Sequence, residues 1–326
     1  MHRIDGPGAT VDNKFTEGDP VGGVQATVVT APWLNDIQEN LMAVLTAAGV
    51  SPTKGRAADL LDSLKKVAVG QTGSGSRVSG LTGNNNSGTP ASQFDFSALS
   101  VTVRNPITGA TAVINNPGSL TNNLLTAGPV ANGRDQAGAF AASTWVHFYY
   151  IWNGTTIATI SSTAQPTAGP TLPSGYTSWA YIGAVYFGAG SALANGNFRG
   201  SWFSYQGAVN AVTSGTSTSL VGVPVPTLVP PNALQFEVGL PTLSLTSSAG
   251  GSFSVTCTLV LQGSTVVFSF GQAGTTSAST AVSFGGTYKR VSNIGQNFAY
   301  QIVVGAGSGA SVSISIPGYS VPNGGE

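Results

Sequence analysis

Apolar side chains recur with a helical period near the start of the chain. Between residues 31 and 48 they alternate at spacings of three and four, which places them on one face of a helix. The members of this stripe are Leu34, Ile37, Leu41, Val44 and Ala48. Thr30 at the N-cap, Pro32 in the first turn and Gly49 after the last turn predict a helix over residues 31–48. Two heptads are too few for a coiled coil, so we expect the stripe to pack on its own domain.

A second, shorter helix is predicted after Ser51-Pro52-Thr53. Its apolar positions are Ala57, Leu60, Leu61 and Leu64, and its charges run from Asp59 and Asp62 to Lys65 and Lys66, an order that suits the helix dipole. Residues 1–29 are rich in Gly, Pro and Asp and are predicted to be extended chain with turns. These elements define an N-terminal module, residues 1–69.

Two segments interrupt the hydrophobic pattern. Residues 70–92 are rich in Gly, Ser and Asn, a composition that predicts a flexible linker. Residues 221–234 contain four prolines and are predicted to be an extended connector. The remaining chain would then form two domains, residues 93–220 and 235–326.

Both of these domains show the period of β-strands. The run from Trp145 to Trp152 is apolar on both faces and ends in the hairpin signal Asn153-Gly154, so we expect it to be buried on both sides or covered by another subunit. After residue 235, apolar residues alternate with Ser and Thr, as in half-buried strands. The predicted fold class is therefore mainly β: a small helical and extended N-terminal module followed by two β-sandwich-like domains.

Charge is scarce, at 7% of the 326 residues against roughly 25% in an average soluble protein. The 24 charges comprise 12 basic and 12 acidic residues, and sixteen of them lie in the first hundred residues. The zero net charge argues against nucleic-acid binding and against a basic membrane-surface face. A hydrophobic content of 41% argues against intrinsic disorder. The chain joins a moderately charged N-terminal part to a nearly ion-free β body.

Targeting and cysteine signals are sparse. Residues 1–20 hold no apolar core of a secretory signal, and no stretch approaches the ~18 consecutive apolar residues of a membrane helix. We therefore expect synthesis in the cytoplasm and no membrane insertion. Cys257 is the single cysteine, which excludes an intrachain disulfide and predicts a buried apolar role for its side chain.

The β body offers few groups for catalysis. Between residues 90 and 325 its carboxylates are Asp95, Asp135 and Glu237, and its one histidine is His147. A pair of these carboxylates, across subunits if necessary, could serve glycoside hydrolysis. No G-x-S-x-G elbow or phosphate loop is present, and His2 and His147 lie in different modules. We expect a structural role for His147, no catalytic residues, no metal and no cofactor.

Aromatic residues, unlike charged ones, are concentrated in one part of the β body. Fifteen of the 28 lie between Phe140 and Tyr205. Flat rings cover much apolar area at a low cost in side-chain freedom, which suits recognition of carbohydrate or protein. Rings that alternate along the 145–152 strand are expected in the core. The candidate receptor-binding residues are Tyr176, Trp179 and Tyr205, with core packing as the alternative.

Part of the sequence resembles bacteriophage tail fibre proteins. The resemblance covers about the first 66 residues and a second, aromatic stretch that does not extend past about Tyr205. The residues that carry it are Ile4 to Gly8, Phe15 to Pro20, Ala26 to Leu41, Ala47 to Val50, Ala57 to Leu64, Arg134-Asp135, Phe140, Trp145 to Gly154, Gly175-Tyr176 and Trp179 to Val185.

The resemblance implies that the N-terminal module fixes a fibre to the tail tip or baseplate and that the β domains bind a host receptor. Trp33, Leu34, Ile37 and Leu41 then belong to the attachment module. Family fibres are usually homotrimers, and their receptors include lipopolysaccharide, outer-membrane proteins and pili. A charge-poor surface also loses little on self-association, and a trimer would add avidity.

The expected function is thus a non-enzymatic, homotrimeric fibre in the virion tail that binds the host surface. One alternative is a structural tail-tip or baseplate protein without receptor contact. Another is a short polysaccharide depolymerase that uses Asp95, Asp135 or Glu237.

Overall fold

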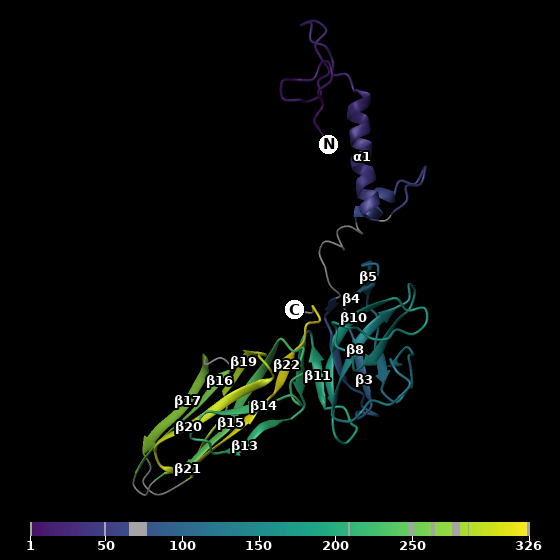
Figure 1. Ribbon diagram of the computed structural model, residues 1–326. Coiled ribbons are helices and arrows are strands. Elements are labelled where there is room, and N and C mark those ends of the chain that lie inside the picture. Colours follow the sequence, from purple (N-terminus) through teal and green to yellow (C-terminus); the bar gives the residue numbers. More distant parts are fainter. Residues whose placement is uncertain are drawn as a thin grey trace. The chain divides into compact units, whose positions relative to one another are not determined.

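A computed structural model describes residues 2–48, 50–64, 77–207, 209–247, 251–261, 265–275, 281–285 and 287–324 of the protein. The chain forms two compact units, Met1–Ser74 and Gly75–Glu326 (Figure 1). Among the described residues, helix is found in the first unit and strands make up the second. The predicted fold class, mainly β with a small helical and extended N-terminal module, is confirmed.

The first unit is built around helix α1, Ala31–Ala47, which ends within one residue of its predicted bounds. Thr30 occupies the N-cap position, but its side chain makes no capping hydrogen bond. Residues 59–64 form the described part of the second helix, and Arg56 bridges Asp59 and Asp62 at 3.3 and 2.6 Å. The predicted helix end at Lys65 and Lys66 and the terminating Gly49 lie outside the described residues.

The described strands of the second unit form three sheets, whose pairings are antiparallel apart from β7–β9. The first sheet has the order β1-β4-β10-β8-β9-β7, with β5 beside β4. Its strands are β1 (Arg77–Ser79), β4 (Ser100–Arg104), β5 (Thr111–Asn115), β7 (Gly133–Arg134), β8 (Thr144–Trp152), β9 (Ile157–Ser162) and β10 (Ser178–Phe187). Seven of the nine residues of β8 are buried, so the prediction that this aromatic run is covered on both faces is confirmed.

The second sheet has eleven strands in the order β13-β21-β15-β22-β12-β11-β2-β3-β6, with β18 and β19 beside β15. Its strands are β2 (Thr82–Asn85), β3 (Gln93–Ser97), β6 (Leu120–Asn123), β11 (Gly196–Arg199), β12 (Trp202–Tyr205), β13 (Asn210–Gly215), β15 (Gln235–Thr246), β18 (Ala281–Phe284), β19 (Thr287–Ser292), β21 (Ser308–Ser315) and β22 (Gly318–Ser320). The third sheet has the order β14-β20-β16-β17. Its strands are β14 (Val221–Pro224), β16 (Ser252–Leu261), β17 (Thr265–Thr275) and β20 (Asn297–Ala306).

One continuous hydrophobic core joins the three sheets. Phe94 and Phe96 of β3 pack on Phe148 of β8 with ring centroids 5.8 and 5.1 Å apart, so the second sheet faces the first there. Cys257 of the third sheet belongs to the same core and is fully buried, as predicted. Burial raises the pKa of the Cys257 thiol to about 12, so it stays an uncharged packing group.

The linker predicted at residues 70–92 is wrong for its described part, residues 77–92. β1 and β2 lie there, and Val78 and Leu81 are 0% and 1% exposed. Asn86, one of the polar residues that favoured a linker, closes a turn instead: its side chain accepts hydrogen bonds from the amides of Gly88 and Thr89. Two buried apolar side chains outweigh the composition of the segment. Residues 70–76 lie outside the described residues.

The proline-rich segment 221–234 also departs from its predicted role as a connector. Its first residues form β14, which pairs with β20, and Val225 and Val229 are 1% and 0% exposed. Valines between the prolines therefore anchor the segment in the core. The boundary between residues 93–220 and 235–326 is crossed by the second sheet, because β22 lies between β12 and β15. Residues 75–326 form one unit rather than two separate domains.

Candidate functional site

Polar residues gather on one face of the second sheet, where β12, β22, β15 and β19 meet. Phe203, Tyr319 and Phe236 of the first three strands are fully buried on the core side. Successive residues of a strand point to opposite faces, so the alternate positions are turned away from the core. Those positions are Trp202 and Ser204 on β12, Gly318 and Ser320 on β22, and Gln235 and Glu237 on β15.

The strand register aligns these residues in rows across the sheet. Ser320 pairs with both Trp202 and Gln235, and Gln235 pairs in turn with Ser292 of β19. Two residues along β15, Glu237 pairs with Arg290. We call this surface the polar sheet face; its residues are Trp202, Gln235, Glu237, Tyr288, Arg290, Ser292, Ser315 and Ser320.

Two glycines let aromatic rings lie close over this face. A Cβ atom on Gly318 would be 2.9 Å from Nε1 of Trp202, and one on Gly239 would be 2.5 Å from Cδ1 and Cε1 of Tyr288. Each ring therefore packs on the backbone of a glycine, at a position where any larger side chain would clash with the ring. The guanidinium carbon of Arg290 lies 4.2 Å from the centroid of the Trp202 ring, a cation–π contact. Tyr288 remains 55% exposed.

Two pockets open on the polar sheet face. The Glu237 pocket has a volume of about 420 Å³ and is lined by Tyr205, Gly207, Glu237, Tyr288, Ser315 and Pro317. The Arg290 pocket has a volume of about 360 Å³ and is lined by Ser201, Trp202, Leu234, Gln235, Arg290, Ser292 and Ser320. Because Glu237 and Arg290 are cross-strand partners, the two pockets are neighbours on one sheet. Aromatic rings with a few convergent polar groups are typical of ligand sites.

The structure separates the three aromatic residues predicted to bind a receptor. All three are half-buried and pack against the core. Trp179 meets Tyr149 edge to face at 5.3 Å and covers Gly169, whereas Tyr205 donates a hydrogen bond to the Leu228 carbonyl at 2.8 Å and lines the Glu237 pocket. Tyr176 and Trp179 are not among the lining residues of either pocket. Only Tyr205 belongs to the candidate site.

Apart from Tyr205 and Glu237, the side chains that define the site are not among the candidates predicted from the sequence. Glu237 is one of the three carboxylates of the β body, and its pairing with Arg290 follows only from the strand register. Trp202 carried a signal, because it alternates with the buried Phe203 on β12. No sequence signal identifies Tyr288, because the position of its ring depends on Gly239, which lies beneath it on another strand.

Among the described residues, the other two carboxylates of the β body, Asp95 and Asp135, hold the structure together through hydrogen bonds. Asp95 accepts hydrogen bonds from Asn86 at 3.0 Å and from Thr121 at 2.6 Å. Asp135 is 8% exposed and accepts the Thr171 amide at 3.2 Å. Among the described residues, no group of three or more His, Cys, Asp or Glu side chains is placed to hold a metal ion.

His147 is a buried core residue, 2% exposed, as its position in an aromatic strand predicted. Its Nδ1 lies 3.0 Å from the hydroxyl of Tyr181, which accepts a hydrogen bond from Asn232 at 2.8 Å. The Tyr181 hydroxyl therefore has its own proton to donate to an uncharged Nδ1. Burial lowers the pKa of His147 to about 4, because the charged imidazolium loses hydration there.

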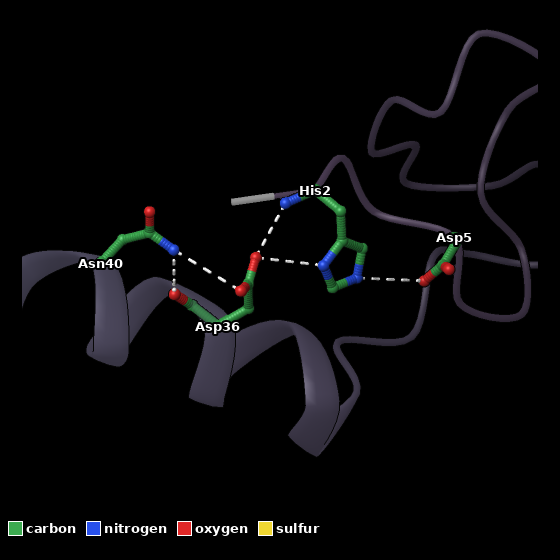
Figure 2. Close-up of polar contacts among 4 residues, drawn as sticks. All are labelled: His2, Asp5, Asp36 and Asn40. Atoms are coloured by element: carbon green, nitrogen blue, oxygen red, sulfur yellow. Dashed lines mark hydrogen bonds and ion pairs between the residues drawn. The ribbon is translucent and has the colours of Figure 1, made fainter.

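In the first unit, the start of the chain is fixed to α1 (Figure 2). The backbone nitrogen and Nδ1 of His2 lie 2.7 and 3.1 Å from Oδ2 of Asp36, and Asn40 donates to the Asp36 carbonyl at 2.7 Å. Nε2 of His2 also lies 3.6 Å from Asp5. The hydrogen bond from the His2 backbone is the main cause that lowers the pKa of Asp36. The chain start and the helix thus share one polar cluster.

The apolar stripe of α1 differs from its predicted packing. Leu34 and Leu41 are 52% and 42% exposed, and Leu45 is the buried residue of the helix. Trp33 packs edge to face on Phe15 at 5.0 Å, and Ile37 is half-buried. The expectation that the stripe packs on its own domain therefore fails at Leu34 and Leu41, which are exposed, whereas Ile37, Val44 and Ala48 are half-buried.

Comparisons with known proteins give little guidance. No protein-family model and no curated protein matches the chain. Among solved structures, the infectious bursal disease virus Gx strain is similar over 72% of this chain and 58% of its own, with 12% identity and a TM-score of 0.22. A Bacillus thuringiensis Cry1Da tryptic core variant is similar over 74% of this chain and 51% of its own, with 9% identity and a TM-score of 0.17. The chain thus spans little more than half of either structure, and TM-scores this low carry no functional information. Within the described part of the chain, no helix has the length and apolar character needed to span a membrane.

Proposed function

We propose that this protein is a non-enzymatic phage tail fibre, assembled as a homotrimer in the virion tail after synthesis in the host cytoplasm. The first unit attaches to tail-tip or baseplate proteins, and the β body binds a receptor on the host surface. The observation that carries the proposal is the polar sheet face, where two pockets combine aromatic rings with charged and hydroxyl groups. The resemblance of the N-terminal module to tail fibres supports the attachment role.

The exposed stripe of α1 supports a contact with another chain. Apolar side chains at positions 34 and 41 are seven residues apart, so they share a helix face, and both lie in the module assigned to attachment. We assign this face to a tail partner. Self-association is assigned to the β body, where few ions would need desolvation.

Replacing Leu34 and Leu41 together with glutamate should lower incorporation of the fibre into phage particles by at least about tenfold, since each lost apolar contact is worth roughly 1.5–3 kcal/mol. Immunoblots of purified particles measure this. The matched control is Asn35→Glu with Gln38→Glu, which adds the same charge at exposed polar positions of the same helix. Light scattering should give both variants and the wild type three times the 32.8 kDa chain mass. A wild-type monomer would contradict the trimer, and normal incorporation of the leucine variant would contradict the attachment surface.

Purified protein should bind host cells and block phage adsorption, because it would occupy the receptor in place of the virion. Counting unadsorbed particles against protein concentration measures this effect. Binding without competition, or no binding, would favour a structural tail-tip role instead. Release of reducing ends from host polysaccharide would favour a depolymerase, and loss of that release in Glu237→Gln would place the chemistry in the Glu237 pocket.

A further inference from the structure

We infer that the Glu237 pocket binds one residue of a neutral oligosaccharide, whose chain continues along the polar sheet face into the Arg290 pocket. The inference deepens the proposed receptor function and rests on it for the biological source of the sugar. It depends on three features: an unpaired carboxylate, an exposed ring fixed on the sheet, and a second pocket rich in hydroxyl groups.

The carboxylate of Glu237 forms no ion pair with Arg290, its neighbour on the adjacent strand. Its cross-strand residue is Arg290, a position at which an ion pair would be expected. The guanidinium instead lies over the Trp202 ring, two strands away from β15. Within the described part of the chain, no hydrogen bond or ion pair reaches the Glu237 side chain, although it is only partly exposed. The two acceptor oxygens of Glu237, which lines the pocket, are therefore free to bind a ligand there.

A carboxylate in this state suits a ligand with two adjacent hydroxyl donors. A carboxylate accepts hydrogen bonds but donates none when ionised, and its bonds to hydroxyl groups are charge-assisted. Neighbouring hydroxyls of a sugar ring can donate to both oxygens at once. The Ser315 hydroxyl in the same pocket adds a group that can donate or accept.

Tyr288 supplies the apolar half of such a site. Its ring edge lies over Gly239, so the ring extends across the sheet beside Glu237, and more than half of the side chain stays exposed. The C–H face of a sugar ring is apolar and can pack on this surface, as aromatic side chains offer apolar area in a fixed geometry. The pocket volume of about 420 Å³ falls within the usual range for small-molecule sites.

The neighbouring pocket favours a neutral chain over a cation or an acidic sugar. Glu237 repels a carboxylate-bearing residue, while the Arg290 charge on the next strand opposes a positively charged ligand. The Arg290 pocket is lined by Ser201, Gln235, Ser292 and Ser320, which offer amide and hydroxyl groups to further sugar units. A linear oligosaccharide is long enough to occupy both pockets, whereas a single small ion would fill neither of them.

The test uses an array of neutral, acidic and amine-bearing oligosaccharides together with isolated host surface polysaccharide. Full-length protein should bind neutral members, and Glu237→Gln and Tyr288→Ala should each weaken that binding at least about tenfold. Tyr288→Phe retains the ring and should bind within about twofold of the wild type, which separates ring packing from loss of fold. Unchanged melting temperatures of the exposed-site variants serve as the folding control.

Three outcomes would overturn the inference: no neutral glycan binds, only acidic or amine-bearing glycans bind, or Glu237→Gln binds as well as the wild type. The adsorption assay keeps this result distinct from the broader proposal. If both variants lose glycan binding but still block adsorption, the fibre role stands and the receptor site lies elsewhere. If the wild type binds glycan through this pocket yet never blocks adsorption, the saccharide site stands and the receptor role fails.

Discussion

Replacing Tyr319 with alanine should lower the free energy of unfolding of the β body by roughly 3–5 kcal/mol, the range for removing a large buried aromatic side chain. Tyr319 is fully buried and its ring stacks on Phe203 with centroids 5.0 Å apart. Its hydroxyl donates to the Ala184 carbonyl of β10 at 2.7 Å. One side chain therefore links β22 to the first sheet as well as to the second.

Chemical denaturation of the purified protein measures this loss. Tyr319→Phe keeps the ring and should cost about 1–3 kcal/mol, because the Ala184 carbonyl loses its donor in a buried place. The matched control is Tyr288→Ala, which removes the same side chain from an exposed position and should change stability by less than about 0.5 kcal/mol. Equal losses at positions 319 and 288 would contradict the assigned roles of the two tyrosines.

Acid should destabilise the β body through His147. In the unfolded chain the imidazole titrates near its ordinary pKa of 6.5, whereas burial lowers the folded value to about 4. The unfolded state therefore binds more protons between these values, and stability falls as the pH drops from about 6.5 towards 4. The expected loss between pH 7 and pH 4 is roughly 3 kcal/mol from this group, at about 1.4 kcal/mol for each pKa unit. Protonated Nδ1 would also face the Tyr181 hydroxyl as a second donor.

His147→Asn tests this assignment, because the Asn amide oxygen can replace Nδ1 as an acceptor for Tyr181 but does not titrate. The variant should be less stable than the wild type at pH 7, since it loses ring volume, yet its stability should change less between pH 7 and pH 4. Denaturation curves at pH 7, 5.5 and 4 give the comparison. Parallel pH profiles for the two proteins would exclude His147 as the source of acid sensitivity.

Local periodicity predicts an element well where the pattern within one segment is enough to determine its secondary structure. The 3-4 spacing of Leu34, Ile37 and Leu41 located α1 within one residue, and the apolar run of β8 identified a strand buried on both faces. Composition is misleading at residues 77–92, because Val78 and Leu81 are buried in the core and Gly83, Asn84 and Asn85 are part of strand β2 rather than of a linker. Whether the apolar stripe of α1 is buried depends on the residues that pack against the helix, and the helical pattern does not determine these.

The candidate site was beyond sequence reasoning for a different reason. Its residues come from β12, β15, β19, β21 and β22, and they meet only because the strand register sets Glu237 opposite Arg290 and places Tyr288 over Gly239. Register between distant strands is a tertiary property, and a slip of one residue would turn each of these side chains to the other face. Tyr205 was identified from its strand-end position, but its partners were not.

The place of β22 in the second sheet also has a consequence for biosynthesis. β12 and β15 are separated in the sheet by β22, a strand of three residues that begins 83 residues after β15 begins and is therefore synthesised later. Until Ser320 has left the exit tunnel, β12 and β15 lack their common neighbour and Phe203 lacks the ring that stacks on it. In a nascent chain, the unpaired edges of both strands therefore stay accessible to chaperones. A prematurely terminated product lacks β22, so it cannot join β12 to β15.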